Sequence, residues 1–144
     1  MLKIISIGKL RNYNAMFYEY VKRIERFSRI EIIELKEEKD KNPEIVKKKE
    51  GEKILNHIKN EFIIVLDAYG RQFSSEEFSN VIKNNPNICF VIGGANGLST
   101  DVLSKANLKF SISRMTLQHD LVKVVLIEQI YRAFTIIKNL EYHK

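Results

Sequence analysis

One stretch decides the fold of this chain, and it reads Phe90-Val91-Ile92-Gly93-Gly94-Ala95-Asn96-Gly97. The apolar run from Ile88 to Ile92 has the composition of a strand buried on both faces. The glycines that follow it allow another molecule to approach the main chain closely. A helix is expected from about Leu98, with Ser99 or Thr100 as its cap. A strand, a glycine turn and a helix start in this order predict a ligand crevice at the carboxyl end of a parallel sheet.

The glycine spacing alone does not identify a ligand. It matches neither the dinucleotide-binding fingerprint nor the phosphate-binding loop, since no Gly-Lys-Ser/Thr sequence follows Gly97. The same stretch would also serve as a tight strand-to-helix turn that binds nothing. The choice between these interpretations depends on the other segments of the chain.

The composition indicates one globular domain. A chain of 144 residues is within the usual range of roughly 100–200 residues per domain, so a single domain over residues 1–144 is expected. Hydrophobic residues make up 44% of the chain and charged residues 29%, which suits a packed core without metals or disulfides. The lone cysteine, Cys89, lies inside the apolar run, and we expect a buried thiol in a protein of a reducing compartment.

The charge and the hydropathy of the chain indicate which kinds of partner and which cellular compartment to expect. The formal net charge of +6 and the pI near 9.4 are compatible with a polyanionic partner such as RNA, while a basic surface without such a role is the alternative. The apolar runs are too short for a signal peptide or a membrane span, so we expect a cytoplasmic protein without a membrane partner.

Strands alternate with helices along the whole chain. Strands are expected over 2–8, 30–35, 62–66, 88–92 and 108–113, and helices from about 14, within 45–58, from 74 to 82, from about 98 and over 120–137. Ser74-Ser75-Glu76-Glu77 has the pattern of a capping box, and the mixed charges of Lys36–Lys49 predict a mobile loop that runs into a helix. This order predicts an α/β fold with a mostly parallel sheet and helices on both faces.

The predicted helix from Asp120 to Ile137 is apolar almost all round. A helix with so little polar surface needs burial on several sides, by the sheet and by another subunit. The sequence therefore predicts a homodimer.

Three segments are expected to meet at one edge of the sheet because each follows a strand: 66–71, 92–97 and 113–119. Together they predict a small-molecule pocket rich in main-chain groups, with apolar sides from Leu66, Met115 and Leu117. No Cys/His cluster has metal-ligand spacing, so no metal is expected, and no Gly-x-Ser-x-Gly elbow is present.

Several motifs of the chain match one known family. They are Leu66-Asp67, Phe90-Val91-Ile92-Gly93-Gly94 with Gly97-Leu98, Met115-Thr116-Leu117, His119, Val124-Val125-Leu126-Ile127-Glu128-Gln129, Tyr131-Arg132-Ala133-Phe134 and the ending Tyr142-His143-Lys144. In these residues the chain resembles the RlmH-type rRNA methyltransferases of the SPOUT superfamily. The resemblance covers essentially the whole chain, with gaps near Lys36–Lys49.

The resemblance implies a fold and a reaction. The fold would contain an α/β trefoil knot in a homodimer. The reaction would transfer a methyl group from S-adenosylmethionine to N3 of a pseudouridine in 23S rRNA, on the assembled ribosome. The cofactor contacts that it implies are Leu66, Gly94, Ser113, Arg114, Met115, Thr116, Leu117 and Gln118.

The resemblance also implies a substrate side, made by Arg132, Tyr142 and His143. The tail 142–144 would fold back over the pocket. His143 is the first candidate for the base that removes the N3 proton, and His119 and Asp67 are weaker ones. Relatives usually have proline where this chain has Gln118, which changes the hydrogen bonding expected of that loop.

Two alternatives from other classes remain at this point. One is a non-enzymatic RNA- or ribosome-binding module with a vestigial pocket. The other is a nucleotide-binding protein of flavodoxin type that uses the turn at 93–97. Binding of S-adenosylmethionine, and not of flavin or NAD, distinguishes the methyltransferase from both.

Overall fold

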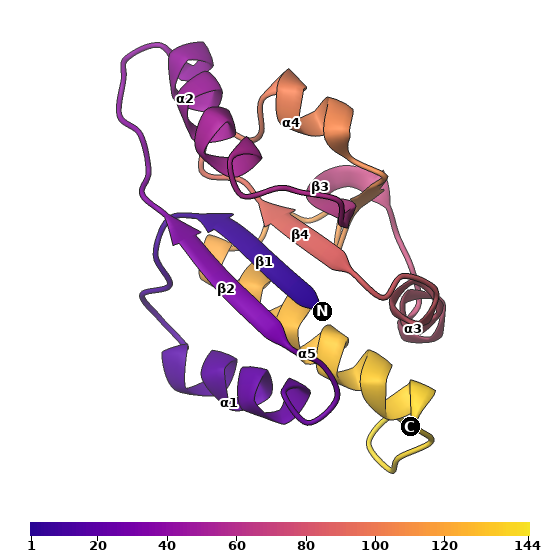
Figure 1. Ribbon diagram of the computed structural model, residues 1–144. Coiled ribbons are helices and arrows are strands. Elements are labelled where there is room, and N and C mark those ends of the chain that lie inside the picture. The colour runs from indigo at the N-terminus through magenta and orange to yellow at the C-terminus, as the bar shows by residue number, and fades with distance from the viewer.

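The structure is a computed structural model that describes residues 1–144. Five parallel strands form one sheet in the order β2-β1-β4-β3-β5 (Figure 1). Their bounds are β1 (Leu2–Ile7), β2 (Ile30–Leu35), β3 (Phe62–Arg71), β4 (Ile88–Ile92) and β5 (Leu108–Phe110). The predicted α/β fold with a parallel sheet is confirmed.

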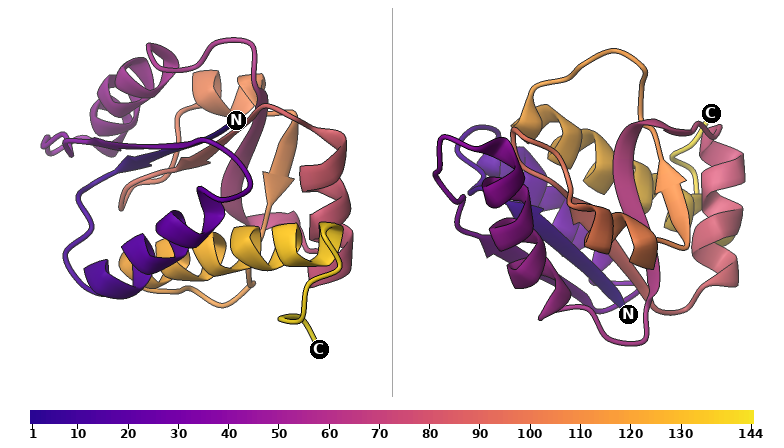
Figure 2. Two further views of the ribbon diagram at one scale, coloured as in Figure 1. Left: turned by 60° about the horizontal axis from the view of Figure 1, so that its bottom comes forward. Right: turned by 90° about the horizontal axis from the view of Figure 1, so that it is seen from above.

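Helices cover both faces of the sheet, as predicted. They are α1 (Asn14–Ile24), α2 (Pro43–Leu55), α3 (Ser75–Asn84), α4 (Thr100–Lys105) and α5 (His119–Ile137). The larger core holds α1, α3 and α5 against one face, and a smaller core holds α2 and α4 against the other. Figure 1 shows this division, and the left view of Figure 2 shows α5 with the C-terminal tail at its far end. None of the helices combines the length and the apolar character that a membrane span needs.

The strand β4 shows why the apolar run at its position is continuous. Successive side chains of a strand point to opposite faces, so Phe90 and Ile92 enter the larger core while Cys89 and Val91 enter the smaller one. Cys89 is fully buried there, and burial raises the pKa of its thiol to about 12. The thiol is therefore a packing group, as predicted, and not a nucleophile.

The helix starts follow the predicted caps. The Ser74 hydroxyl accepts a hydrogen bond from the Glu77 N–H, and the Glu77 carboxylate accepts one from the Ser74 N–H. The Ser99 hydroxyl caps α4 by accepting from the Val102 N–H. Asn42 caps α2 at Pro43, so the charged segment is a helix for half of its length. The rest of it is tied to α2, since Lys53 Nζ donates to the Lys36 carbonyl at 2.8 Å.

The region around Gly70 differs from the prediction. Strand β3 continues to Arg71, whereas the polar residues after Leu66 predicted a turn. Here the chain passes so close to β5 that a Cβ on Gly70 would lie 2.6 Å from the carbonyl carbon of Lys109. Arg71 pairs with Phe110 after a register shift, and β5 ends at that residue. Long-range pairing therefore made a strand where local composition indicated a loop.

Candidate functional site

A cavity of about 830 Å³ lies at the carboxyl ends of β1, β3 and β4. The three segments predicted to meet there all contribute to its walls. Of the residues predicted to contact a cofactor, those that line the cavity are Leu66, Gly94, Ser113, Met115, Thr116, Leu117 and Gln118. Arg114 is exposed and does not line it.

The glycine turn after β4 forms one wall of the cavity. A Cβ on Gly94 would lie 2.9 Å from Cγ2 of Ile7 and 3.3 Å from Oε1 of Glu50. Glycine is therefore required at this position by the protein's own packing, before any ligand is considered. The turn is closed by the Gly97 N–H, which donates to the Gly94 carbonyl at 3.0 Å, and Gly97 takes a φ of 82°.

The loop before α5 forms a second wall and offers main-chain donors that have no partner in the chain. The Ser113 hydroxyl accepts a hydrogen bond from the Met115 N–H at 3.0 Å. The N–H groups of Thr116, Leu117 and Gln118 donate no hydrogen bond within the chain. Free main-chain groups next to apolar side chains suit a flat heteroaromatic ring with polar edges, such as adenine. The cavity volume is also within the roughly 300–1,000 Å³ of small-molecule sites.

A third wall is the loop from Gly8 to Asn12, which sequence reasoning missed. Asp120 Oδ2 accepts from the N–H groups of Arg11 and Asn12 at 3.1 and 2.9 Å. Burial opposes ionisation of this carboxyl, but the two hydrogen bonds outweigh burial. The pKa of Asp120 therefore lies below its ordinary value. The sequence contained one signal for this contact: Asp120 and, one turn later, Lys123 are charged residues in the mostly apolar first half of α5.

That lysine, Lys123, completes the anchor of the loop. Its side chain is 2% exposed, and Nζ donates to the Gly8 carbonyl at 2.9 Å and to Glu34 Oε2 at 3.2 Å. A buried ammonium needs such partners because an unpaired one is strongly destabilising. The loop is therefore held rigidly, and it presents Lys9 and Arg11 at the cavity.

The two weaker candidates for the base both lie at the cavity. Asp67 lines it, and its Oδ1 accepts from the Tyr69 N–H at 2.9 Å, as in an Asx turn. His119 lines it as the first residue of α5, with Nδ1 at 3.7 Å from Asp120 Oδ1. Nε2 of His119 is buried and has no hydrogen-bond partner. An unpartnered buried nitrogen is costly unless a ligand completes it.

The residues predicted for the substrate side lie elsewhere. Arg132, Tyr142 and His143 do not line the cavity. His119 and Arg132 are about 20 Å apart along α5 at roughly 1.5 Å per residue, and the tail follows the far end of that helix (Figure 2). The expectation that the tail folds back over the pocket of its own chain is therefore not met.

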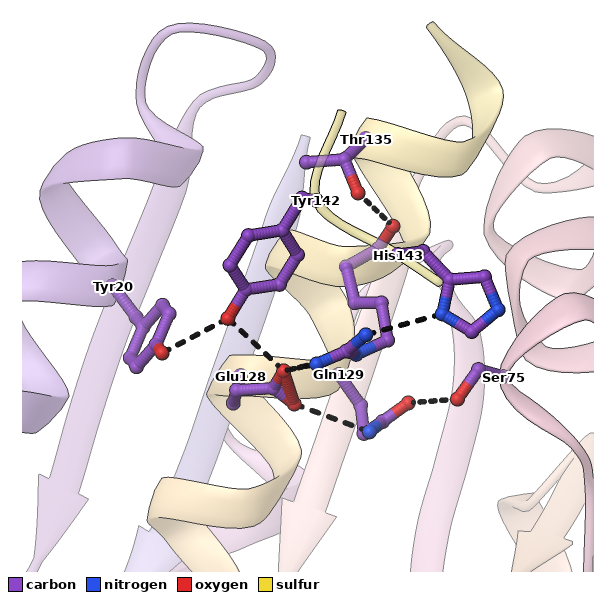
Figure 3. Close-up of polar contacts among 8 residues, drawn as sticks. Tyr20, Ser75, Glu128, Gln129, Thr135, Tyr142 and His143 are labelled. Carbon is purple, nitrogen blue, oxygen red and sulfur yellow. Dashed lines mark hydrogen bonds and ion pairs between the residues drawn. The ribbon is translucent and has the colours of Figure 1, made fainter. Parts of the chain in front are cut away.

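The tail is nevertheless held in place by hydrogen bonds (Figure 3). Glu128 Oε1 accepts from Arg132 Nε at 2.9 Å, from Arg132 Nη2 at 2.6 Å and from the Tyr142 hydroxyl at 3.2 Å. The hydroxyl groups of Tyr142 and Tyr20 are 3.0 Å apart. Burial, the bond to Tyr20 and the Glu128 carboxylate all raise the pKa of Tyr142 above its ordinary value. The tail is thus anchored to α1 and α5.

The imidazole of His143 has a partner on each side. Nδ1 lies 3.1 Å from Arg132 Nη1, and Nε2 lies 2.7 Å from Oε1 of Glu76 on α3. Sequence reasoning missed Glu76 because its position in the first turn of α3 already gave it a role at the helix start. No group of three or more His, Cys, Asp or Glu side chains is placed to hold a metal ion.

Comparison with known proteins gives the same family from two directions. The family model described as "Predicted SPOUT methyltransferase" matches residues 1–143. Proteins named "Ribosomal RNA large subunit methyltransferase H" are 45% identical in Clostridium beijerinckii and 46% identical in Clostridium botulinum, each over 99% of both chains. The protein of that name from Caldicellulosiruptor saccharolyticus is 46% identical over 100% of both chains.

A solved structure shares the fold. The chain is similar to a "probable methylase family protein" from Haemophilus influenzae Rd KW20, with a TM-score of 0.57 and 13% identity. The similarity covers 99% of this chain and 70% of the other. With the full-length matches above, the resemblance first seen in scattered motifs is confirmed, and the chain belongs to the SPOUT methyltransferase family.

Proposed function

We propose that this protein transfers a methyl group from S-adenosylmethionine to N3 of a pseudouridine in large-subunit rRNA, with the assembled ribosome as its substrate. The observation that carries the proposal is the identity of 45–46% along the full length of relatives named as large-subunit rRNA methyltransferases. Membership of a methyltransferase family disfavours both alternatives, the flavodoxin-type protein and the binding module without a reaction.

The cavity fits the proposed cofactor. The unpaired N–H groups of residues 116–118 would bind the adenine edge, while Leu66 and Leu117 would cover its faces. Close packing behind Gly94 keeps that wall free of side-chain atoms. The cofactor would supply a methyl group on a positively charged sulfur, and the protein's part is to hold that methyl in line with the attacking nitrogen.

Cations at the cavity support a polyanionic substrate. Lys9 and Arg11 are exposed at its edge and form no ion pair. Because Asp120 and Lys123 hold their loop, they would meet RNA phosphates at fixed positions. The net charge of +6 would add long-range attraction.

The distance between tail and cavity supports a dimer in which two chains share each site. Leu121 and Val125 lie on α5 outside both cores, and Leu121 is exposed. A two-fold axis near Val125 would pair the two α5 helices antiparallel through this face. Such pairing brings the tail of one chain toward the cavity of its mate, and there His143, Tyr142 and Arg132 would reach the target base.

The trefoil knot that family membership implies is part of the same proposal. In knotted SPOUT proteins the cofactor site and the knot coincide, and here the candidate segment is the loop 113–118 with the close passage at Gly70. In the proposed dimer His143 would accept the N3 proton, since histidine is the side chain most often used as a base near neutral pH. His119 and Asp67 are the candidates if it does not.

The experiment is a transfer assay with methyl-labelled S-adenosylmethionine. Assembled ribosomes, isolated large subunits and deproteinised rRNA from a strain lacking the modification are offered in parallel. We expect labelling of assembled ribosomes above all, and mass spectrometry of the digested rRNA to identify a methyl group on N3 of pseudouridine. Labelling of another base, or none in any substrate with folded enzyme, would refute the proposal.

The dimer is tested separately by light scattering. We expect the wild type to be dimeric at low micromolar concentration. Val125→Glu places a charge on the face of α5 outside the cores and should give monomers or aggregates in place of dimers. A monomeric wild type would rule out the shared site.

A further inference from the structure

The His143 side chain lies between two groups that come from different elements. Arg132, on α5, has Nη1 at 3.1 Å from Nδ1. Glu76, on α3, has Oε1 at 2.7 Å from Nε2. Only 23% of the His143 side chain is exposed, so its ring is held in one place by the tail and these two neighbours.

The chemistry of the two partners determines which ring nitrogen carries the proton. A guanidinium can only donate hydrogen bonds, so Nδ1 of His143 must be the acceptor from Arg132. An ionised carboxylate can only accept, so Nε2 must carry the hydrogen that points at Glu76. Both partners therefore select the same neutral tautomer, with the proton on Nε2 and the lone pair on Nδ1.

We propose that Glu76 is a positioning residue for methyl transfer, and that it holds His143 in the tautomer whose Nδ1 is the proton acceptor. This inference rests on the proposed function. The N3–H of the target base would replace Arg132 Nη1 at Nδ1. The N3 proton then moves to Nδ1, the N3 electron pair forms the new bond to the methyl carbon, and the carbon–sulfur bond breaks with its electron pair remaining on sulfur. The imidazolium that results keeps its Nε2–H on Glu76.

Glu76 is the carboxylate of this cluster that contacts His143, because the neighbouring carboxylates have other partners. Arg132 binds Glu128 through Nε and Nη2, so its Nη1 can leave Nδ1 to the target base while the guanidinium keeps its carboxylate partner. The neighbouring carboxylate, Glu77, is occupied with the Ser74 N–H. The hydrogen bond from His143 lowers the pKa of Glu76, which keeps the acceptor ionised.

Stability does not explain the Glu76 contact. The Glu76 side chain is 63% exposed, and an ion pair at such a site contributes little to folding because water screens it. The geometry of the contact is therefore more informative than its energy. Orientation of a histidine by a carboxylate is the arrangement that sets the tautomer of many catalytic imidazoles.

The direct test is nitrogen-15 NMR of histidine-labelled protein, in the full-length wild type without ribosomes. At alkaline pH, where imidazoles are neutral, the His143 resonances should show an unprotonated Nδ1 and a protonated Nε2. In Glu76→Ala the exchange of this Nε2 proton with water should be roughly tenfold faster. Glu76→Gln, which keeps an oxygen acceptor, should restore much of the protection.

The matched control is Glu77→Ala. It removes the same charge from the same turn of α3 and breaks the capping box, but it does not touch His143. We expect its His143 resonances to equal those of the wild type. In ribosome methylation, Glu76→Ala should lower kcat by about 10- to 100-fold with little change in KM, as for other carboxylates that orient a histidine.

Two NMR results would overturn the proposal: a proton on Nδ1 in the wild type, or the same proton exchange in Glu76→Ala as in the wild type. Both results come from NMR of the protein alone and need no methylation assay. They can therefore be distinguished from a failure of the proposed function. A kcat of Glu76→Ala equal to that of the wild type, with the tautomer as expected, would also overturn the positioning role.

Discussion

The two ends of α5 are built in opposite ways. At the His119 end, polar groups are left open: Nε2 of His119 and the main-chain N–H groups of residues 116–118 have no partner in the chain. At the far end, the tail and α5 form a closed set of side-chain hydrogen bonds in which Arg132, Tyr142 and His143 all have partners.

The difference indicates what each end is for. A buried nitrogen without a partner, such as Nε2 of His119, costs stability until a ligand satisfies it, and free main-chain donors beside it are typical of a binding site. The hydrogen-bonded side chains of the tail carry no such loss of stability, and their bonds fix the imidazole of His143 in one orientation. In the proposed dimer, the end that binds belongs to one chain and the end that acts belongs to its mate.

The largest effect is expected at the acting end. His143→Ala should reduce the rate of ribosome methylation by about 10²- to 10⁴-fold, the usual contribution of a general base. The affinity for S-adenosylmethionine in calorimetry should be unchanged, because His143 lies outside the cavity. His119→Ala is the comparison, since His119 does line it. If His119→Ala loses the rate and His143→Ala keeps it, the base lies at the cavity end.

The next effect concerns the binding end. Gly94→Val should abolish S-adenosylmethionine binding, and it should also lower the free energy of unfolding by about 1–3 kcal/mol through overpacking. The added atoms would meet Ile7 and Glu50 first, so loss of stability accompanies loss of binding. Asn96→Ala, in the same turn but outside the cavity, is the control for both measurements. Normal binding by a folded Gly94→Val protein would exclude this wall from the site.

A smaller effect is expected when the hydrogen bond between the tail and α1 is removed. Tyr20→Phe removes the hydroxyl that meets Tyr142 but keeps the ring that packs on Tyr131. We expect a loss of about 0.5–1.5 kcal/mol in denaturant unfolding, together with a lower methylation rate. Tyr18→Phe on the same helix removes a hydroxyl without a hydrogen bond, so it should change neither. Equal stability of the two variants would mean that the hydrogen bond between Tyr20 and Tyr142 does not hold the tail in place.

The comparison also shows where sequence reasoning succeeds and why. The alternation of apolar strands and amphipathic helices is a local signal, and it led to the correct order of elements and to the edge where the cavity lies. The caps at Ser74 and Ser99 are local too, and both are confirmed. The binding end is made mostly of such segments, each following its own strand, so the segments could be named from the sequence pattern, while the individual cofactor contacts were implied by the family resemblance.

The remaining features depend on contacts between distant segments. Nothing near Gly70 in the sequence indicates its close passage to Lys109, and nothing near Glu76 indicates a histidine 67 positions away. The position of the tail could not be predicted because family motifs name residues without saying which chain's cavity they serve. Asp120 and Lys123 were visible as polar exceptions in an apolar helix, but their partners in the loop 8–12 were not.

The smallest effect concerns Glu50, whose carboxylate lies behind Gly94 at the binding end. Its side chain is 3% exposed, Oε2 accepts from the Glu38 N–H at 3.0 Å, and Oε1 has no partner. Burial raises the pKa of Glu50, the Glu37 carboxylate adds to the effect, and the bond from Glu38 opposes it. This carboxylate is thus one more polar group that the binding end leaves incomplete.

A raised pKa in the folded state sets the sign of the pH dependence. Ionised Glu50 costs stability; the cost is absent below the ordinary value of 4.5, grows as the pH rises through the folded-state pKa, and is complete above it. Glu50→Gln keeps an oxygen for the Glu38 N–H and removes the charge. It should therefore be more stable than the wild type at neutral pH in urea unfolding, and the difference should vanish toward pH 4.5. Glu52→Gln, exposed on the same helix, should show no such trend. A Glu50→Gln protein that is less stable at neutral pH would mean that the ionised carboxylate has a stabilising partner, and the binding end would then be more closed than its hydrogen bonds indicate.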